Sequence, residues 1–105
     1  MPTTVVEPEV VEETRLEPPY NVVLLDDQHH TYEYVVEMLG KLFGYGSEKA
    51  FKMAREVDTS GRVIVWTGSL ERAEFHRDRI HGYGKDWRIA ECAGSMSAVI
   101  EPVEG

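Results

Sequence analysis

The chain has 105 residues and a formal net charge of −8, with 11 basic side chains against 19 acidic ones. This length suits one domain with a single modest core, and the acidic balance argues against a nucleic-acid binder, which needs a basic face. One cysteine, Cys92, excludes a disulfide framework within the chain, and no apolar run approaches the roughly 20 residues of a membrane span. We therefore expect a soluble cytoplasmic protein that binds neither nucleic acid nor membrane.

Residues 1–19 differ in composition from the rest of the chain. They hold five glutamates, one arginine and four of the five prolines. Such a segment buries too little apolar surface to offset the entropy of ordering it, and the Pro18-Pro19 pair makes a stiff boundary with the next segment. We predict a disordered acidic, proline-rich extension over 1–19 and one folded domain over 20–105.

The first predicted strand, Tyr20–Leu25, is nearly all β-branched or apolar, as expected of a buried strand. Five polar residues, 26–30, separate it from a helix that begins near Thr31, which is a suitable N-cap. The apolar residues of this helix recur at spacings of three and four and form one stripe: Val35, Met38, Leu39 and Leu42. Gly44 ends the helix.

Ser47 is predicted to cap a second helix, whose inward face comprises Ala50, Met53, Ala54 and Val57. The remaining segments are predicted as a turn over 58–61, a buried strand over 63–66, a charged surface helix over 70–81, a long loop over 84–95 and a last strand over 96–101. The order strand–helix–helix–strand–helix–strand predicts an α+β fold, in which three helices pack on one face of a three-stranded antiparallel sheet.

Three carboxylates stand where two of these elements end. Asp26 and Asp27 follow the first strand directly, and Asp58 follows the apolar face of the second helix. Ionised carboxylates are hydrogen-bond acceptors, so side chains of this kind can bind a cationic donor such as an ammonium group. Each well-formed charge-assisted hydrogen bond contributes roughly 1.5–3 kcal/mol.

The segment from Asp26 to Val35 reads Asp-Asp-Gln-His-His-Thr-Tyr-Glu-Tyr-Val. It resembles the signature of the ClpS family, in which a strand ends in Asn-Asp-Asp and a helix begins near a Met-Glu-Phe-Val run. ClpS proteins are adaptors that hand N-degron substrates to the Clp protease. The resemblance runs from Tyr20 to Tyr83 and resumes over the last strand, so it implies the same fold and a non-catalytic adaptor function without a cofactor.

The resemblance also implies which residues bind the substrate. The α-amino group would be held by Asp26, Asp27 and Asp58, where the family has asparagine at the first position and histidine at the third. The pocket for the first side chain would be lined by Gln28, His30, Tyr32, Val35, Ala54, Val57 and Met96. Two methionines of the family are replaced here, by Tyr32 at the rim and by Ala54 in the wall.

The family's primary ligands are N-terminal Leu, Phe, Tyr and Trp, and we expect this chain to keep them, with some tolerance of Ile. Burying such a side chain is worth roughly 1.5–3 kcal/mol. The resemblance implies that a monomer docks on the N-terminal domain of a Clp AAA+ unfoldase through Glu71 and His76. The family has a lysine at the position of His76. The extension over 1–19 either engages the unfoldase or is a solvated leader without a role.

Three alternative interpretations fit the residues less well. Zinc could be held by histidines and the cysteine, namely His29, His30, His76, His81 and Cys92, but no Cys-x-x-Cys or His-x-x-x-His spacing exists, so no metal site is predicted. Acid–base catalysis by the three carboxylates lacks an accompanying nucleophile, phosphate loop or cofactor fingerprint. A structural or ribosome-associated module of similar fold would need no acidic turn beside an apolar cavity.

Overall fold

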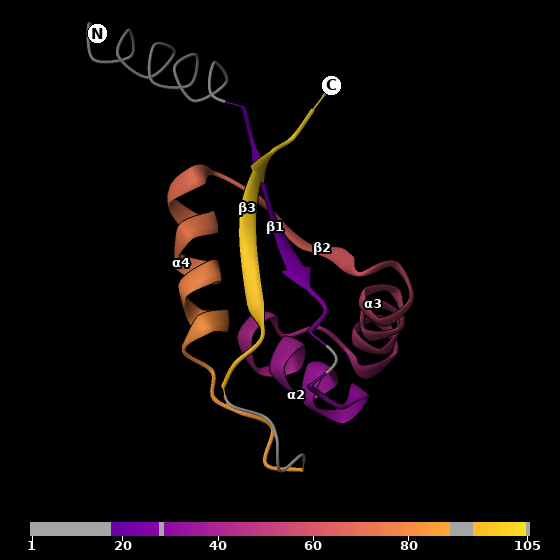
Figure 1. Ribbon diagram of the computed structural model, residues 1–105. Helices are drawn as coiled ribbons and strands as arrows, with labels where there is room; N and C mark the ends of the chain where they lie inside the picture. The colour runs from indigo at the N-terminus through magenta and orange to yellow at the C-terminus, as the bar shows by residue number, and fades with distance from the viewer. Residues whose placement is uncertain (1–17, 28, 89–93, 105) are drawn as a thin grey trace, which may run out of the picture.

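The protein is described by a computed structural model that covers residues 18–27, 29–88 and 94–104. Its elements follow the expected order (Figure 1): β1 Tyr20–Leu25, α2 Tyr32–Phe43, α3 Ser47–Ser60, β2 Arg62–Gly68, α4 Leu70–His81 and β3 Ser97–Pro102. The predicted fold class is confirmed. Residues 1–17 of the N-terminal extension, Gln28 and Cys92 lie outside the described residues.

The sheet has the order β2-β1-β3, and β1 is antiparallel to both neighbours. Because β1 is the central strand, its Val22, Val23 and Leu24 are 0% exposed. The ladder between β1 and β2 contains a bulge between Val22 and Val23. The bulge follows from one extra residue in β2, and it increases the local twist of the pair.

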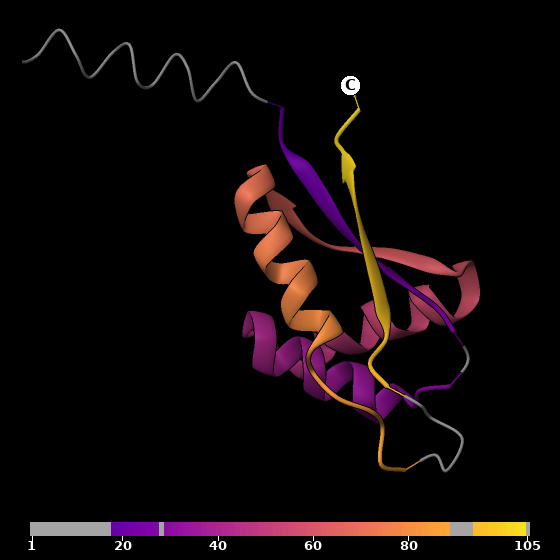
Figure 2. The same ribbon diagram turned by 60° about the vertical axis from the view of Figure 1, so that its left-hand side comes forward.

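The two faces of the sheet differ. Val22 and Leu24 point to the helices and belong to the main core cluster, whereas Ile64 and Val99, which flank Val23, are 46% and 37% exposed. The helices therefore cover one face only. Figures 1 and 2 show α4 beside β3 and β1, with α2 and α3 where β1 ends.

Polar side chains cross the uncovered face. Arg62 of β2 lies in register with Leu25, Glu101 of β3 lies in register with Asn21, and the two form an ion pair with Nη2 and Oε1 2.5 Å apart. The pair thus runs diagonally over the middle of β1, where Val23 sits. This cover accounts for the complete burial of a valine on the side without helices.

The helix ends follow the predicted capping chemistry with two corrections, both at α3. Thr31 caps α2 by accepting a hydrogen bond from the Tyr34 amide, and Gly44 ends α2 with φ 75°. The N-cap of α3 is Gly46 rather than Ser47. The turn predicted over 58–61 is wrong for its first three residues, because α3 continues to Ser60 and ends at Gly61, whose φ of 85° favours glycine.

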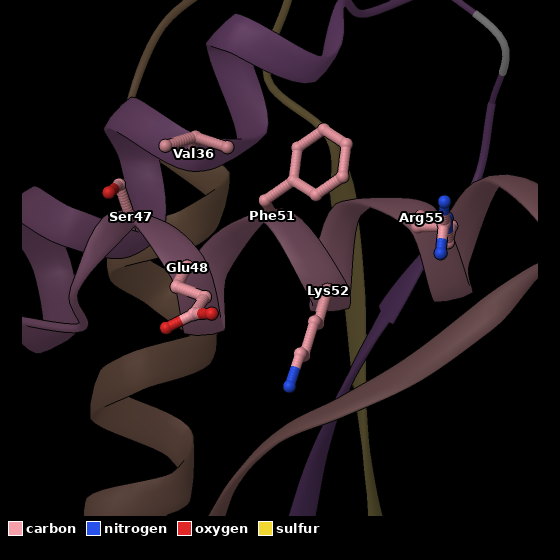
Figure 3. Close-up of a pocket in the computed structure, with 6 residues that line it drawn as sticks. All are labelled: Val36, Ser47, Glu48, Phe51, Lys52 and Arg55. Atoms are coloured by element: carbon pink, nitrogen blue, oxygen red, sulfur yellow. The ribbon is translucent and has the colours of Figure 1, made fainter.

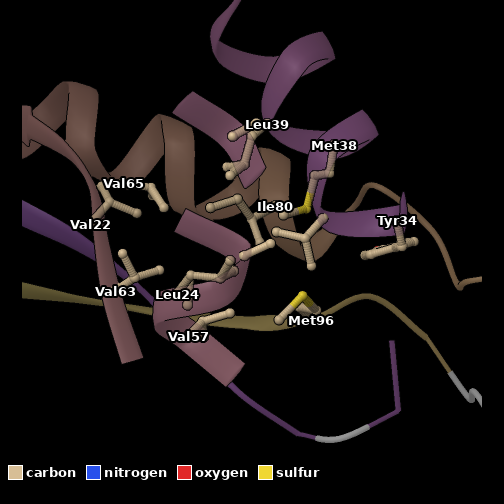
Figure 4. Packing of buried hydrophobic residues seen from close by; sticks show 14 of the residues in the cluster. Val22, Leu24, Tyr34, Met38, Leu39, Val57, Val63, Val65, Ile80 and Met96 are labelled. Atoms are coloured by element: carbon tan, nitrogen blue, oxygen red, sulfur yellow. The ribbon is translucent and has the colours of Figure 1, made fainter. Parts of the chain in front are cut away.

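The core lies between the helices and the inner face of the sheet (Figure 4). Val35, Met38 and Leu39 of the predicted α2 stripe are buried, while Leu42 is half-buried. Tyr34 was not predicted as a core residue, yet it is 2% exposed. None of the helices in the described part of the chain has the length and apolar character of a membrane span.

Candidate functional site

The end of β1 and the end of α3 lie side by side. The amide of Asp26 donates to the carbonyl of Gly61, with N and O 3.1 Å apart. Asp58 lies in the last turn of α3, three residues before that carbonyl. One backbone hydrogen bond therefore brings Asp26 close to the part of α3 that carries Asp58.

Tyr32, in the first turn of α2, joins this group. Its hydroxyl donates to Asp58 Oδ2 at 2.7 Å. The hydrogen bond to Asp58 raises the pKa of the Tyr32 phenol, and the negative charge of Asp26 acts in the same direction. Asp26, Asp58 and Tyr32 thus form one acidic cluster, in which Asp58 is exposed and Asp26 and Tyr32 are half-buried.

Asp27 has a different orientation. Its Oδ1 accepts from the His29 amide at 3.0 Å and lies 2.8 Å from His30 Nδ1. The other ring nitrogen of His30 lies 2.8 Å from the Gly94 carbonyl oxygen. His30 is thus held between two acceptor oxygens, one on Asp27 and one on the backbone of Gly94. Asp27 keeps its second oxygen for another donor.

The predicted apolar lining residues come together, but inside the core. Val35, Ala54, Val57 and Met96 are 4%, 1%, 2% and 2% exposed, and all belong to the main cluster. Figure 4 shows Val57 and Met96 close to one another on the inner side of the sheet. His30, also predicted to line the pocket, is packed against the Tyr34 ring, with centroids 4.5 Å apart. The four apolar side chains are part of the packed core.

A residue that the sequence did not single out supports the start of α2. Asp86 is 0% exposed, and its Oδ2 accepts from the amide and the hydroxyl of Thr31 at 2.7 and 2.8 Å. Its Oδ1 accepts from the amide and from Nη1 of Arg88, both at 3.1 Å. Asp86 therefore ties the loop after α4 to the N-cap of α2. Its only signal in the sequence is an acidic residue within a long loop.

The two residues predicted to dock a protease differ in exposure. Glu71 is exposed on the first turn of α4. His76 is 7% exposed, its ring lies 4.5 Å from that of Trp66 and 4.9 Å from that of Phe43, and neither ring nitrogen has a hydrogen-bond partner among the described residues. Burial lowers the pKa of His76, and the charge of Arg79 adds to this effect.

Metal ligation finds no support in the part of the chain that the structure describes, where no three His, Cys, Asp or Glu side chains are grouped to hold an ion. The chemistry that the acidic cluster offers is hydrogen-bond acceptance by anions at an open surface. This arrangement suits a cationic donor.

Comparison with known proteins identifies the family. Residues 15–87 match the family model described as "ATP-dependent Clp protease adaptor protein ClpS". The chain belongs to the ClpS family. A ClpS adapter of Nocardia farcinica is 33% identical over 81 residues, covering 73% of this chain and 76% of the relative. A ClpS adapter of Rhodococcus jostii is 32% identical over 93 residues, covering 88% and 82%.

A solved structure supports the fold. Agrobacterium tumefaciens ClpS2, bound to L-phenylalaninamide, is 20% identical with a TM-score of 0.71, covering 82% of this chain and 98% of the other. The predicted family is thus confirmed, and the protein is an adaptor of the ATP-dependent Clp protease rather than an enzyme.

Proposed function

We propose that this ClpS-family protein binds the free α-amino group and the bulky hydrophobic first side chain of N-degron substrates, and delivers them to a Clp AAA+ unfoldase. The carrying observation is the acidic cluster of Asp26, Asp58 and Tyr32 at the junction of β1, α2 and α3. The ligand of Agrobacterium ClpS2, L-phenylalaninamide, supports the proposal. It carries a free amine, an aromatic side chain and an amide, like the first residue of a chain.

The ammonium would lie between the carboxylates of Asp26 and Asp58, and the second oxygen of Asp27 would be its third acceptor. Asp58 Oδ2 accepts from Tyr32, so Oδ1 serves the ligand. Ionised carboxylates have about four lone-pair sites each, so they can accept both donors. A neutral N-acetyl group offers no such charge and would lose these bonds.

The first side chain would enter the apolar region lined by Val35, Ala54, Val57 and Met96. These residues fill the region, so binding would require Met96 to move. Its unbranched thioether chain makes this possible at low cost. Once Met96 has moved, the small side chain of Ala54 would leave room for a large ligand side chain, which fits a preference for Leu, Phe, Tyr and Trp with tolerance of Ile.

Docking to the unfoldase's N-terminal domain is assigned to the exposed face of α4. Glu71 supplies a charge, and Phe75, 57% exposed on the same helix, supplies apolar area. The docking role of His76 stays a prediction. Because its side chain is only 7% exposed, this role is limited to holding its neighbours in position. The same proposal includes that the protein is a cytoplasmic monomer and that its N-terminal extension contacts the unfoldase.

The test is fluorescence anisotropy with peptides that differ only at their first residue or in N-terminal acetylation. The wild type should bind Leu-, Phe-, Tyr- and Trp-first peptides, and acetylation or Ala at residue one should abolish binding. Asp58→Asn should weaken binding about tenfold or more, because one charge-assisted bond is worth roughly 1.5–3 kcal/mol.

The matched control is Asp78→Asn, which removes an exposed carboxylate on α4 and should leave the affinity unchanged. Equal affinity for free and acetylated peptides would contradict the proposal. That result would favour the alternative, a structural or ribosome-associated interaction module that does not read chain ends.

A further inference from the structure

His30 stands between β1 and α2, and its side chain is 3% exposed. Its Nδ1 lies 2.8 Å from Asp27 Oδ1, and its Nε2 lies 2.8 Å from the carbonyl oxygen of Gly94. The ring packs against that of Tyr34 in α2. One buried side chain therefore connects Asp27, a residue assigned to the α-amino group, with the loop between α4 and β3.

This loop is itself fixed to the start of α2. The hydroxyl of Tyr34 donates to the Gly84 carbonyl, and the amide of Gly84 donates to Ser95 Oγ at 2.6 Å, which joins the two ends of the loop. The buried carboxylate of Asp86 accepts from the amide and the hydroxyl of Thr31. The loop carbonyl that faces the imidazole thus belongs to a segment that is tied to α2 at other points as well.

Contacts on two opposite sides hold α2. On one side lies α3, and Figure 3 shows Phe51 projecting from α3 towards α2 with Val36 beside it. Tyr34 precedes Val36 by two residues, and residues two apart on an α-helix differ in direction by about 200°. Tyr34 and the His30 ring that packs on it therefore lie on the side of α2 away from Val36, where the loop after α4 contacts them.

The two donors to Asp27 reach the same oxygen. The His29 amide donates to Asp27 Oδ1, with N and O 3.0 Å apart, and His30 Nδ1 lies 2.8 Å from that oxygen. Since an ionised carboxylate only accepts, Nδ1 is the donor in the second contact. The Asp27 side chain is 34% exposed, so without these contacts it has room to rotate. Fixing one oxygen from two directions sets where the other oxygen points before a ligand arrives.

We propose that His30 is a positioning residue for binding of the α-amino group, which orients the Asp27 carboxylate and is itself held by the loop after α4. This inference rests on the proposed function. A carboxylate that is already oriented loses less conformational freedom when the ammonium binds, and preorganisation of this kind increases affinity. His30 thereby acts through Asp27 and makes the recognition of a chain end depend on a loop that is distant in the sequence.

Three substitutions of His30 separate its two polar contacts in fluorescence anisotropy with a Leu-first peptide. Phe keeps a ring against Tyr34 and removes both contacts. Asn has its amide nitrogen near the place of Nδ1 and retains a donor for Asp27, whereas Gln has its amide nitrogen near the place of Nε2 and retains a donor for Gly94. His30→Phe should weaken binding about three- to tenfold. His30→Asn should bind more tightly than His30→Phe and more weakly than wild type, and His30→Gln should bind no more tightly than His30→Phe.

The matched control is His29→Phe, the same substitution at the exposed neighbouring histidine. It keeps the main-chain amide that donates to Asp27, so the affinity should stay as in wild type. A double-mutant cycle with Asp27→Asn tests the route of the effect. Adding His30→Phe to Asp27→Asn should change the affinity by less than about twofold, because the carboxylate through which His30 acts is already gone. If urea unfolding shows that His30→Phe does not fold, the comparison of His30→Asn with His30→Gln decides the point.

Wild-type affinity of a folded His30→Phe variant would overturn the inference and leave the proposed function standing. Effects of His30→Phe and Asp27→Asn that multiply in the double variant would have the same meaning, and so would tighter binding by His30→Gln than by His30→Asn. Equal binding of free and acetylated peptides by the wild type would overturn both proposals.

Discussion

Asp86→Asn should destabilise the protein by an amount that depends on pH. Asp86 is buried and accepts four hydrogen bonds, two from Thr31 and two from Arg88. Burial alone would raise the pKa of Asp86, but the hydrogen bonds from Thr31 and then from Arg88 outweigh it and lower the pKa from 3.8 to about 2. Asparagine keeps the shape and one acceptor and removes the charge.

Two estimates of the effect agree. Lowering the pKa of Asp86 from 3.8 to about 2 corresponds to about 2 kcal/mol of extra stability at neutral pH, since one pKa unit is about 1.4 kcal/mol. Independently, hydrogen bonds to a charged group contribute about 1.5–3 kcal/mol. We therefore expect Asp86→Asn to lower the free energy of unfolding by about 2 kcal/mol at pH 7.

The pH dependence follows from the direction of the shift. The folded pKa of Asp86 lies below the unfolded one, so its contribution is complete above the unfolded value and is lost as the pH falls towards about 2. The difference between wild type and variant should shrink to about half at pH 3. Urea unfolding followed by circular dichroism at pH 7, 5 and 3 measures this difference.

The control removes the other carboxylate that contacts Arg88. Glu37 is half-exposed, so Glu37→Gln should change the free energy of unfolding by less than about 1 kcal/mol. A loss below about 0.5 kcal/mol for Asp86→Asn at pH 7 would refute the reasoning. A difference that stays constant down to pH 3 would refute it equally.

Three further predictions concern other sites. Burial lowers the pKa of His76, so below about pH 6.5 the unfolded chain binds more protons than the folded one. In urea unfolding, the free energy of unfolding of the wild type should therefore fall between pH 7 and pH 5, and His76→Leu should not show this loss. Gly68→Ala should cost about 1–3 kcal/mol in the same assay, because the new Cβ would lie 2.2 Å from the Trp66 ring. Tyr32→Phe should raise the affinity for a Leu-first peptide roughly twofold to tenfold in anisotropy, since both oxygens of Asp58 become open to the ammonium.

Each of these has an outcome that contradicts it. If the free energy of unfolding changed with pH in the same way for wild type and His76→Leu, His76 would not be the cause of the loss of stability. Gly94→Ala, where a Cβ meets nothing within 4 Å, controls for the loss of glycine, and an equal effect of both alanines would exclude the ring clash. Weaker peptide binding by Tyr32→Phe would mean that the hydroxyl holds Asp58 in its binding position.

The sequence predicted those features that depend on neighbouring residues. Spacings of three and four found the buried face of α3 at Ala50, Ala54 and Val57, because one helix face is defined locally. The cap at Thr31 and the stop at Gly44 were found for the same reason. The end of α3 was placed three residues early, since polar residues such as Thr59 are compatible with a turn as well as with a last helical turn.

The features that escaped prediction depend on distant parts of the chain. Asp86 lies 55 residues from Thr31 in sequence, and no local pattern connects them. The hydroxyl of Tyr34 donates to the Gly84 carbonyl, and this partner allows a polar aromatic residue to be buried. The orientation of Asp27 also has no local signal, because Asp27 contacts His30, whose other ring nitrogen lies against the distant Gly94 carbonyl.

The ion pair between Arg62 and Glu101, on the face of the sheet that the helices leave uncovered, affects how the protein behaves at high concentration. Without this ion pair, Ile64, Val23 and Val99 would form a continuous apolar surface across the three strands. Two sheets can pack face to face on a surface of this kind. Arg62 and Glu101 interrupt that surface with opposite charges. Replacing both with alanine should therefore increase the self-association of the adaptor.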